Sequence, residues 1–100
     1  MIKRYICMLI SALLPVVAFS QEYTISGHVR NQANGEVLIG ANVYLEGTTT
    51  GTTTNAYGFY SISLDAGNYT LVCTYVGYAT TTIPINLQEN EKVDIELEQI

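Results

Sequence analysis

Few residues of this chain have side chains that could carry out chemistry. His28 is the only histidine, and it lies near Arg30 on the polar side of an alternating stretch. A catalytic triad needs a nucleophile, a base and an orienting group, and a zinc site needs several ligands. The sequence supplies neither set. We therefore predict no enzyme activity and no catalytic, cofactor-binding or metal-binding residues.

The two cysteines, Cys7 and Cys73, are not expected to form a disulfide. Cys7 falls in an N-terminal segment that we predict to be removed. Cys73 alternates in phase with Leu71 and Tyr69, which indicates a small buried side chain. A reactive thiol would need a neighbouring cation or base, and none is close to Cys73 in the sequence.

Three further patterns resemble functional motifs, but we interpret each of them as structural. The stretch GTTTGTTT at 47–54 has spaced glycines, but a phosphate-binding loop also needs a lysine. Five carboxylates between positions 89 and 98 lack the spacing of a calcium loop. Asn68 begins an Asn-Tyr-Thr glycosylation pattern, yet Asn is also common in turns. We interpret the threonines as strand residues and Asn68 as a turn residue.

Residues 1–20 have the pattern of a secretory signal peptide. Lys3 and Arg4 precede an apolar run at 5–17, and Ala18-Phe19-Ser20 fits a small-x-small cleavage site. The run is shorter than the roughly 20 residues that a membrane-spanning helix needs. We predict a signal peptide at 1–20 and one exported domain at 21–100.

The exported part is strongly acidic. Without Lys3 and Arg4, it keeps only Arg30 and Lys92 as strong cations, against nine carboxylates. Nucleic acids and anionic membrane surfaces attract basic proteins. The charge therefore argues against both as partners.

Alternation of apolar and polar residues predicts an all-β domain, an antiparallel sandwich of two sheets. The expected strands are 23–31, 41–46, 59–64, 69–75, 79–87 and 92–98, with a short edge strand within 47–54. The segment 51–77 is interpreted as a meander whose turns lie at 55–58 and 65–68. Pro84 cannot donate to a ladder, so its strand should lie at a sheet edge or have the N–H side of Pro84 free.

The predicted core takes one face of each strand. It comprises Ile25, Val29, Val43, Leu45, Tyr60, Ile62, Leu64, Tyr69, Leu71, Val93, Ile95 and Leu97.

Tyr44 and Phe59 fall on the outward phase of their strands, and Val72 joins them. Aromatic side chains on an exposed sheet face can stack on a sugar ring or dock another protein. The alternative is that this face belongs to the core of the second sheet, or that the phase is shifted by one residue. We take the three residues as a candidate contact surface.

Six motifs in order give the sequence a family likeness. They are Gly27-His28-Val29, Gly40 to Val43, Gly47-Thr48, Tyr57 to Ser61, Gly67 to Leu71 and Tyr75 to Tyr78. Together they resemble the carboxypeptidase regulatory-like domain over nearly all of the exported part. Two departures are visible: Tyr57 replaces a usual Asp before Gly58, and Leu38-Ile39 replaces a frequent Pro-containing entry.

The resemblance implies a transthyretin-like (prealbumin-like) β-sandwich of about seven strands with Greek-key-like connections. It also implies a non-catalytic periplasmic module of, or beside, a TonB-dependent, SusC-like outer-membrane nutrient receptor, in which this domain follows the signal peptide. The expected partners are the receptor plug and barrel or components of the TonB system. Two alternatives stay open: a secreted carbohydrate-binding module, and a folding or regulatory domain of a carboxypeptidase-like protein.

Overall fold

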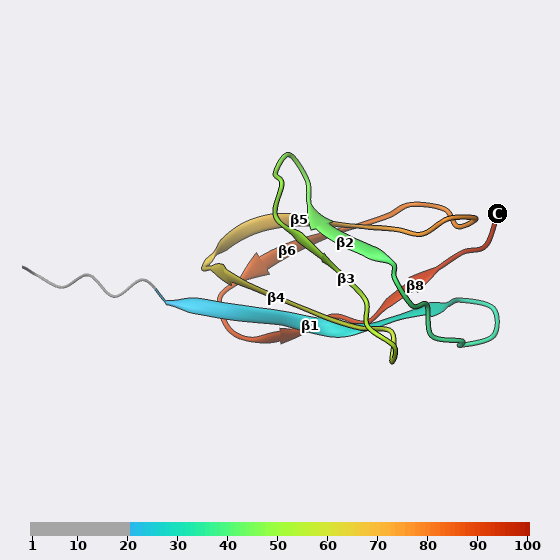
Figure 1. Ribbon diagram of the computed structural model, residues 1–100. Helices are drawn as coiled ribbons and strands as arrows, with labels where there is room; N and C mark the ends of the chain where they lie inside the picture. Colours follow the sequence, from blue (N-terminus) through green and yellow to red (C-terminus); the bar gives the residue numbers. More distant parts are fainter. Residues whose placement is uncertain (1–20) are drawn as a thin grey trace, which may run out of the picture.

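Residues 21–100, the part of the chain that this computed structural model describes, form two β-sheets and no helix (Figure 1). The predicted signal peptide at 1–20 lies outside the described residues. The strands are β1 (Glu22–Asn31), β2 (Asn42–Leu45), β3 (Gly51–Thr53), β4 (Phe59–Asp65), β5 (Gly67–Thr74), β6 (Thr81–Leu87), β7 (Glu91–Lys92) and β8 (Ile95–Leu97). The predicted all-β sandwich is confirmed, with eight short strands in place of about seven.

The two sheets lie one above the other (Figure 1). Sheet 1 has the order β4-β1-β7, and β8 also pairs with β1. Sheet 2 has the order β3-β2-β5-β6. β3 and β6 therefore form the edges of sheet 2, which confirms the edge positions predicted from the Gly-Thr stretch and from Pro84.

The C-terminal strands differ from the prediction of an antiparallel sandwich. β7 and β8 run parallel to β1, with Ile25 opposite Glu91 and Val29 opposite Ile95. The predicted single strand 92–98 is interrupted at Val93 and Asp94. Alternation predicts which face of a strand is buried, but it carries no information on strand direction.

The segment 51–77 is not a meander, so that interpretation was wrong. β3 pairs with β2, β4 with β1, and β5 with β2 and β6. The turns at 55–58 and at Ala66 carry the chain from one sheet to the other. A strand buries its apolar face whether the next strand lies beside it in the same sheet or opposite it across the core. Alternation therefore fits both arrangements.

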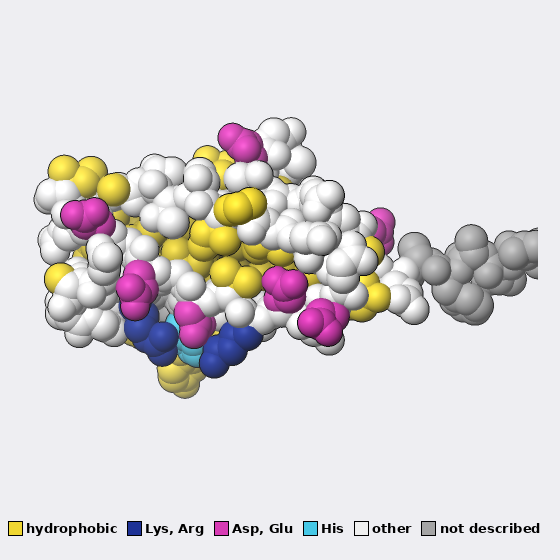
Figure 2. Space-filling view, turned by 180° about the vertical axis from the view of Figure 1, so that it is seen from behind, with side chains coloured by type: hydrophobic (Ala, Val, Ile, Leu, Met, Phe, Trp, Pro, Cys, Tyr) yellow, Lys and Arg dark blue, Asp and Glu magenta, His cyan; other side chains and the backbone are white. Residues whose placement is uncertain are grey.

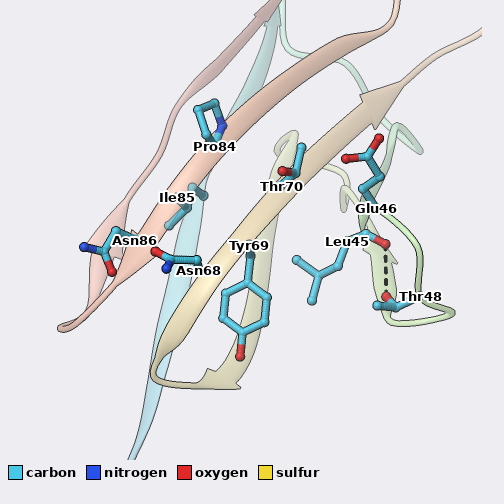
Figure 3. A pocket seen from close by; sticks show the side chains of 9 residues that line it. All are labelled: Leu45, Glu46, Thr48, Asn68, Tyr69, Thr70, Pro84, Ile85 and Asn86. Atoms are coloured by element: carbon cyan, nitrogen blue, oxygen red, sulfur yellow. Dashed lines mark hydrogen bonds between the residues drawn. The ribbon is translucent and has the colours of Figure 1, made fainter.

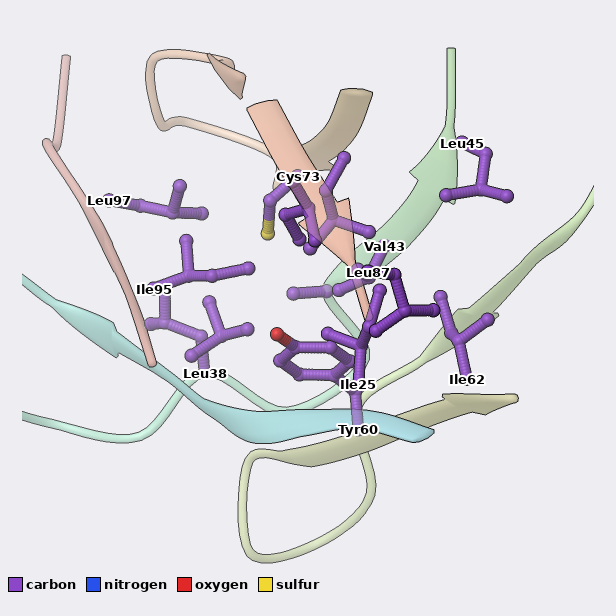
Figure 4. Packing of buried hydrophobic residues seen from close by; sticks show 14 residues of the cluster. Ile25, Leu38, Val43, Leu45, Tyr60, Ile62, Cys73, Leu87, Ile95 and Leu97 are labelled. Atoms are coloured by element: carbon purple, nitrogen blue, oxygen red, sulfur yellow. The ribbon is translucent and has the colours of Figure 1, made fainter. Parts of the chain in front are cut away.

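The core lies between the two sheets (Figure 4). It confirms the predicted core except at Leu64, Tyr69 and Val93, which are partly buried and pack against it. The buried members of the prediction are Ile25, Val29, Val43, Leu45, Tyr60, Ile62, Leu71, Ile95 and Leu97. Leu38, Ala41, Cys73, Ile85 and Leu87 complete the cluster.

The direction of each strand decides at which end of the sandwich each connection lies. β1 and β5 end where β2, β4 and β6 begin, because these pairs are antiparallel. The connections 32–41, 54–58 and 75–80 and the C-terminus therefore share the end that lies away from Glu22, and we call it the distal end (Figure 1).

Hydrogen bonds hold the distal end together. Asn31, at the end of β1, donates from Nδ2 to the hydroxyl of Tyr78 at 2.9 Å. The backbone N–H of Ile100 donates to the carbonyl oxygen of Gly77 at 2.9 Å. Both bonds join sheet 1 to the β5–β6 connection of sheet 2. The end of β1 and the C-terminus are therefore tied to the β5–β6 connection at the distal end.

Candidate contact surfaces

Tyr44 and Phe59 lie on opposite layers of the sandwich. Tyr44 belongs to β2 in sheet 2, and its neighbours Val43 and Leu45 are buried. Phe59 begins β4 in sheet 1, and its neighbour Tyr60 is buried. The two aromatic side chains are similarly exposed, at 37% and 36%, but each points outward from its own sheet. They therefore do not form one contiguous surface.

Val72 lies on the same outer face as Tyr44 but offers almost no surface. It stands opposite Tyr44 on one side and Thr82 on the other, and it is only 5% exposed. Side chains of directly opposite residues lie about 5 Å apart at Cβ, close enough to cover a β-branched residue between them. Val72 therefore supports the position of Tyr44 and does not itself make contact with a partner.

The strand residues on the outer face of sheet 2 are mostly polar and carry no charge, and Glu46 follows β2 at the margin of this face. Opposite residues of an antiparallel sheet share a face, so the register places them in rows. The members of this face are Asn42, Tyr44, Gly51, Thr53, Asn68, Thr70, Val72, Thr74, Thr82, Pro84 and Asn86. We call this set the sheet 2 outer face. Its donors and acceptors are hydroxyl and amide groups.

Two open hollows lie along sheet 2. The smaller, of about 450 Å³, is lined by Tyr44, Gly51 and the row of Asn42, Thr53 and Thr74, together with Thr52. The larger, of about 720 Å³, is shown in Figure 3. Its lining comprises Leu45, Glu46, Thr48, Asn68, Tyr69, Thr70, Pro84, Ile85 and Asn86. Both volumes fall in the range of small-ligand sites, roughly 300–1,000 Å³.

The outer face of sheet 1 has a different character. The ring of His28 packs edge-to-face on Phe59 with the ring centroids 5.4 Å apart. Asp94 accepts the backbone N–H of His28 at 2.9 Å, and its Oδ1 lies 4.0 Å from Nδ1 of the imidazole. All Lys, Arg and His side chains visible in Figure 2 gather on the lower side of that view. His28 is therefore a half-buried residue on the outer face of sheet 1.

The distal end carries exposed apolar side chains. Ile39, Tyr57 and Val76 lie on three different connections of this end, and Val76 is 95% exposed. Each immediately precedes a glycine with positive φ, at Gly40, Gly58 and Gly77. A turn that needs positive φ places the residue before the glycine at its tip. The pattern of an apolar residue followed by glycine is visible in the sequence, but the predicted contact surface did not include these residues.

Two buried titratable groups belong to the core. Burial raises the pKa of the Cys73 thiol to about 11, which keeps the thiol protonated at neutral pH. Burial, with smaller contributions from Cys73 and Asp94, raises the pKa of Tyr60 far above its usual value. Within residues 21–100, no cluster of three or more His, Cys, Asp or Glu side chains could hold a metal ion.

Residues 25–99 match the CarboxypepD_reg-like domain family. The chain belongs to this family. The resemblance that the ordered motifs predicted is therefore confirmed. The family match covers every buried core residue and the lining of both hollows. Within the described part of this CarboxypepD_reg-like domain, no helix is long and apolar enough to cross a membrane.

Relatives of this CarboxypepD_reg-like domain are TonB-dependent receptors. The chain is 36% identical to the TonB-dependent receptor SusC of Bacteroides thetaiotaomicron over 90% of its own length and 9% of the receptor. It is 32% identical to TonB-dependent receptor P3 of Formosa agariphila over 97% of its length and 10% of that receptor. The chain thus spans about a tenth of the length of the curated relatives it matches.

Solved structures share the fold. A chain in the crystal structure of a type II cohesin–X–dockerin complex from Acetivibrio cellulolyticus superposes with a TM-score of 0.66 at 24% identity, covering 75% of this chain and 56% of that one. A DUF3823 family protein from Parabacteroides merdae gives a TM-score of 0.62 at 19% identity, covering 81% and 48%. At these identities the likeness shows the β-sandwich alone.

Proposed function

We propose that this chain is a non-catalytic accessory domain of a TonB-dependent outer-membrane receptor. The observation that carries the proposal is its similarity to receptors of this type over at least nine-tenths of its length. The proposal includes export through residues 1–20 and a place in the periplasm beside the outer membrane.

The proposed role of the domain is to contact protein, either the plug and barrel of the receptor or components of the TonB system. The distal end supports this role, because Ile39, Tyr57 and Val76 are exposed on three of its connections. Exposed apolar side chains are typical contact points of protein interfaces. A contact that buries them gains roughly 25 cal/mol per Å² of apolar surface before the cost of association is subtracted.

Site-specific photocrosslinking in the native organism tests this function. A photoreactive amino acid at Val76 is expected to crosslink to receptor or TonB-system polypeptide in the outer-membrane fraction. Glu36 is the matched control site, because it is exposed but polar and lies in the β1–β2 connection of the same end. A chain that fractionates away from the outer membrane, or that crosslinks only to unrelated proteins from both sites, would refute the proposal.

A further inference from the structure

The sheet 2 outer face differs from the rest of the molecule in its charge. β2, β3, β5 and β6 contain no Asp, Glu, Lys, Arg or His, although the chain as a whole is strongly acidic. The charged strand residues all lie in β1, β4, β7 and β8 of sheet 1. The strands of one layer therefore carry no charge, and Glu46, directly after β2, is the one charged residue in the lining of the larger hollow, whereas the strands of the other layer carry charges of both signs.

Tyr44 stands in the middle of this neutral face with free space beside it. The opposite residue on β3 is Gly51, and a Cβ at that position would lie 2.7 Å from the Cβ of Tyr44. Only glycine allows β3 to approach β2 this closely, and both Gly51 and Tyr44 line the smaller hollow. On the other side, buried Val72 supports Tyr44. The base of the Tyr44 side chain is thus held between β3 and β5, and Tyr44 borders the smaller hollow.

The polar groups beside Tyr44 both donate and accept hydrogen bonds. Asn42, Thr53 and Thr74 form the neighbouring row and line the smaller hollow. Amides and hydroxyls pair with hydroxyl groups in either direction, and they do so without a charge that an ionic ligand would require. The C–H-bearing face of a sugar ring suits the π face of an aromatic side chain.

The two hollows are adjacent along β2. Tyr44 lines the smaller hollow and Glu46 lines the larger. Residues two apart on a strand point the same way and lie about 7 Å apart. Asn68, Thr70 and Asn86 continue the hydroxyl and amide lining in the larger hollow, where Glu46 adds one carboxylate. An extended ligand with repeated hydroxyl-bearing units would meet similar groups in both.

We propose that the sheet 2 outer face binds a neutral oligosaccharide, with Tyr44 stacking on one sugar ring and Asn42, Thr53 and Thr74 bonding its hydroxyls. A protein partner suits this face less well, because binding hot spots need apolar or arginine anchors around the aromatic residue. Besides Tyr44, the only exposed apolar side chain of the face is Pro84, and Val72 is covered. This inference goes beyond the proposed receptor role and does not depend on it.

Titration of the purified, ¹⁵N-labelled full chain tests the inference by NMR. The probes are neutral hexasaccharides of α-1,4-, β-1,4- and β-1,3-linked glucose and of β-1,4-linked mannose, with hexagalacturonate as the anionic control. At least one neutral probe is expected to shift the amide signals of Asn42, Thr53 and Thr74. Tyr44→Ala is expected to weaken that binding at least about tenfold, whereas Tyr44→Phe keeps most of it.

Phe59→Ala is the matched control, since Phe59 is as exposed as Tyr44 but lies on the other sheet. It is expected to leave binding unchanged, and the dispersed amide spectrum of each variant reports whether it is folded. The inference is overturned if no neutral probe binds up to about 10 mM, a very weak affinity. It is also overturned if hexagalacturonate binds as strongly as the neutral probes, or if the shifted signals belong to sheet 1. Binding of a second copy of the chain to this face in place of a sugar, or normal sugar binding by Tyr44→Ala, would overturn it too. Crosslinking from Val76 is independent of these outcomes.

Discussion

The hydroxyl of Tyr60 donates a 2.5 Å hydrogen bond to the carbonyl oxygen of Val93. Tyr60 lies on β4 with its side chain almost fully buried, and Val93 lies in the break between β7 and β8. The same carbonyl oxygen would be 2.1 Å from a Cβ on Gly27. One core side chain and one glycine of β1 together fix the place where the parallel C-terminal segment crosses sheet 1.

Removing this hydroxyl should destabilise the fold. Tyr60→Phe leaves the ring in place but deprives the Val93 carbonyl of its donor, which typically costs about 1–3 kcal/mol. Urea unfolding followed by circular dichroism measures the loss. Tyr69→Phe is the control, because the hydroxyl of Tyr69 bonds the Asp65 carbonyl oxygen at an exposed position. That change should cost about 1 kcal/mol or less, and equal losses would contradict this account of Tyr60.

Gly27 is expected to tolerate no side chain. Gly27→Ala would place its Cβ against the backbone of Val93, which cannot move without displacing β7 and β8 from β1. Overpacking of this kind costs about 1–3 kcal/mol or more, and we expect at least about 3 kcal/mol here. Thermal unfolding measures it. Ser26→Ala, on the neighbouring outward position, should stay within about 0.5 kcal/mol of the original. A Gly27→Ala chain as stable as Ser26→Ala would show that the crossing can shift freely.

Which face of each strand is buried could be predicted from the sequence, but which strands pair could not. Val43 and Tyr44 face in and out as their alternation predicts. The same alternation suits β4 whether it pairs beside β5 or faces it across the core. The parallel pairing of β8 depends on the close approach at Gly27 and on Asp94 accepting the N–H of His28. Neither contact leaves a periodic signal.

The candidate surface was predictable only in part, for a related reason. Period-two alternation correctly placed Tyr44 and Phe59 outward, but it could not tell that they belong to different sheets. It also placed Val72 outward without showing that Tyr44 and Thr82 flank it. The neutral character of sheet 2 becomes visible only when strands far apart in the sequence are sorted into layers.

The buried hydroxyl of Thr54 is expected to stabilise the segment that leads into β2. Thr54 Oγ1 donates to the Leu38 carbonyl oxygen at 2.6 Å and accepts the N–H of Ala41 at 2.9 Å. Thr54→Val keeps the shape but leaves both backbone groups without this partner, at a cost of about 1–3 kcal/mol. Thr54→Ser keeps the hydroxyl and should lose less, which chemical denaturation can compare. If Thr54→Val matched Thr54→Ser, the two hydrogen bonds would contribute little.

The buried thiol of Cys73 should make the fold less stable in alkali. Burial raises the pKa of this thiol from 9.0 to about 11. Above pH 9 the unfolded chain releases the proton while the folded chain still holds it, so the unfolded state gains stability. The stabilisation is fully present below pH 9 and is lost as the pH rises to about 11, a change on the order of 2 kcal/mol.

Urea midpoints measured at several pH values between about 7.5 and 11 test this prediction. Cys73→Val removes the titrating group and should flatten the decline between pH 9 and 11, although its stability at neutral pH also changes through packing. Tyr60 stays in both chains, and burial, the largest cause of its raised pKa, acts in each, so Tyr60 adds nearly the same alkaline loss to both. Comparing the two slopes therefore isolates the thiol. Curves that fall in parallel would mean that the Cys73 thiol titrates alike in the folded and unfolded chains.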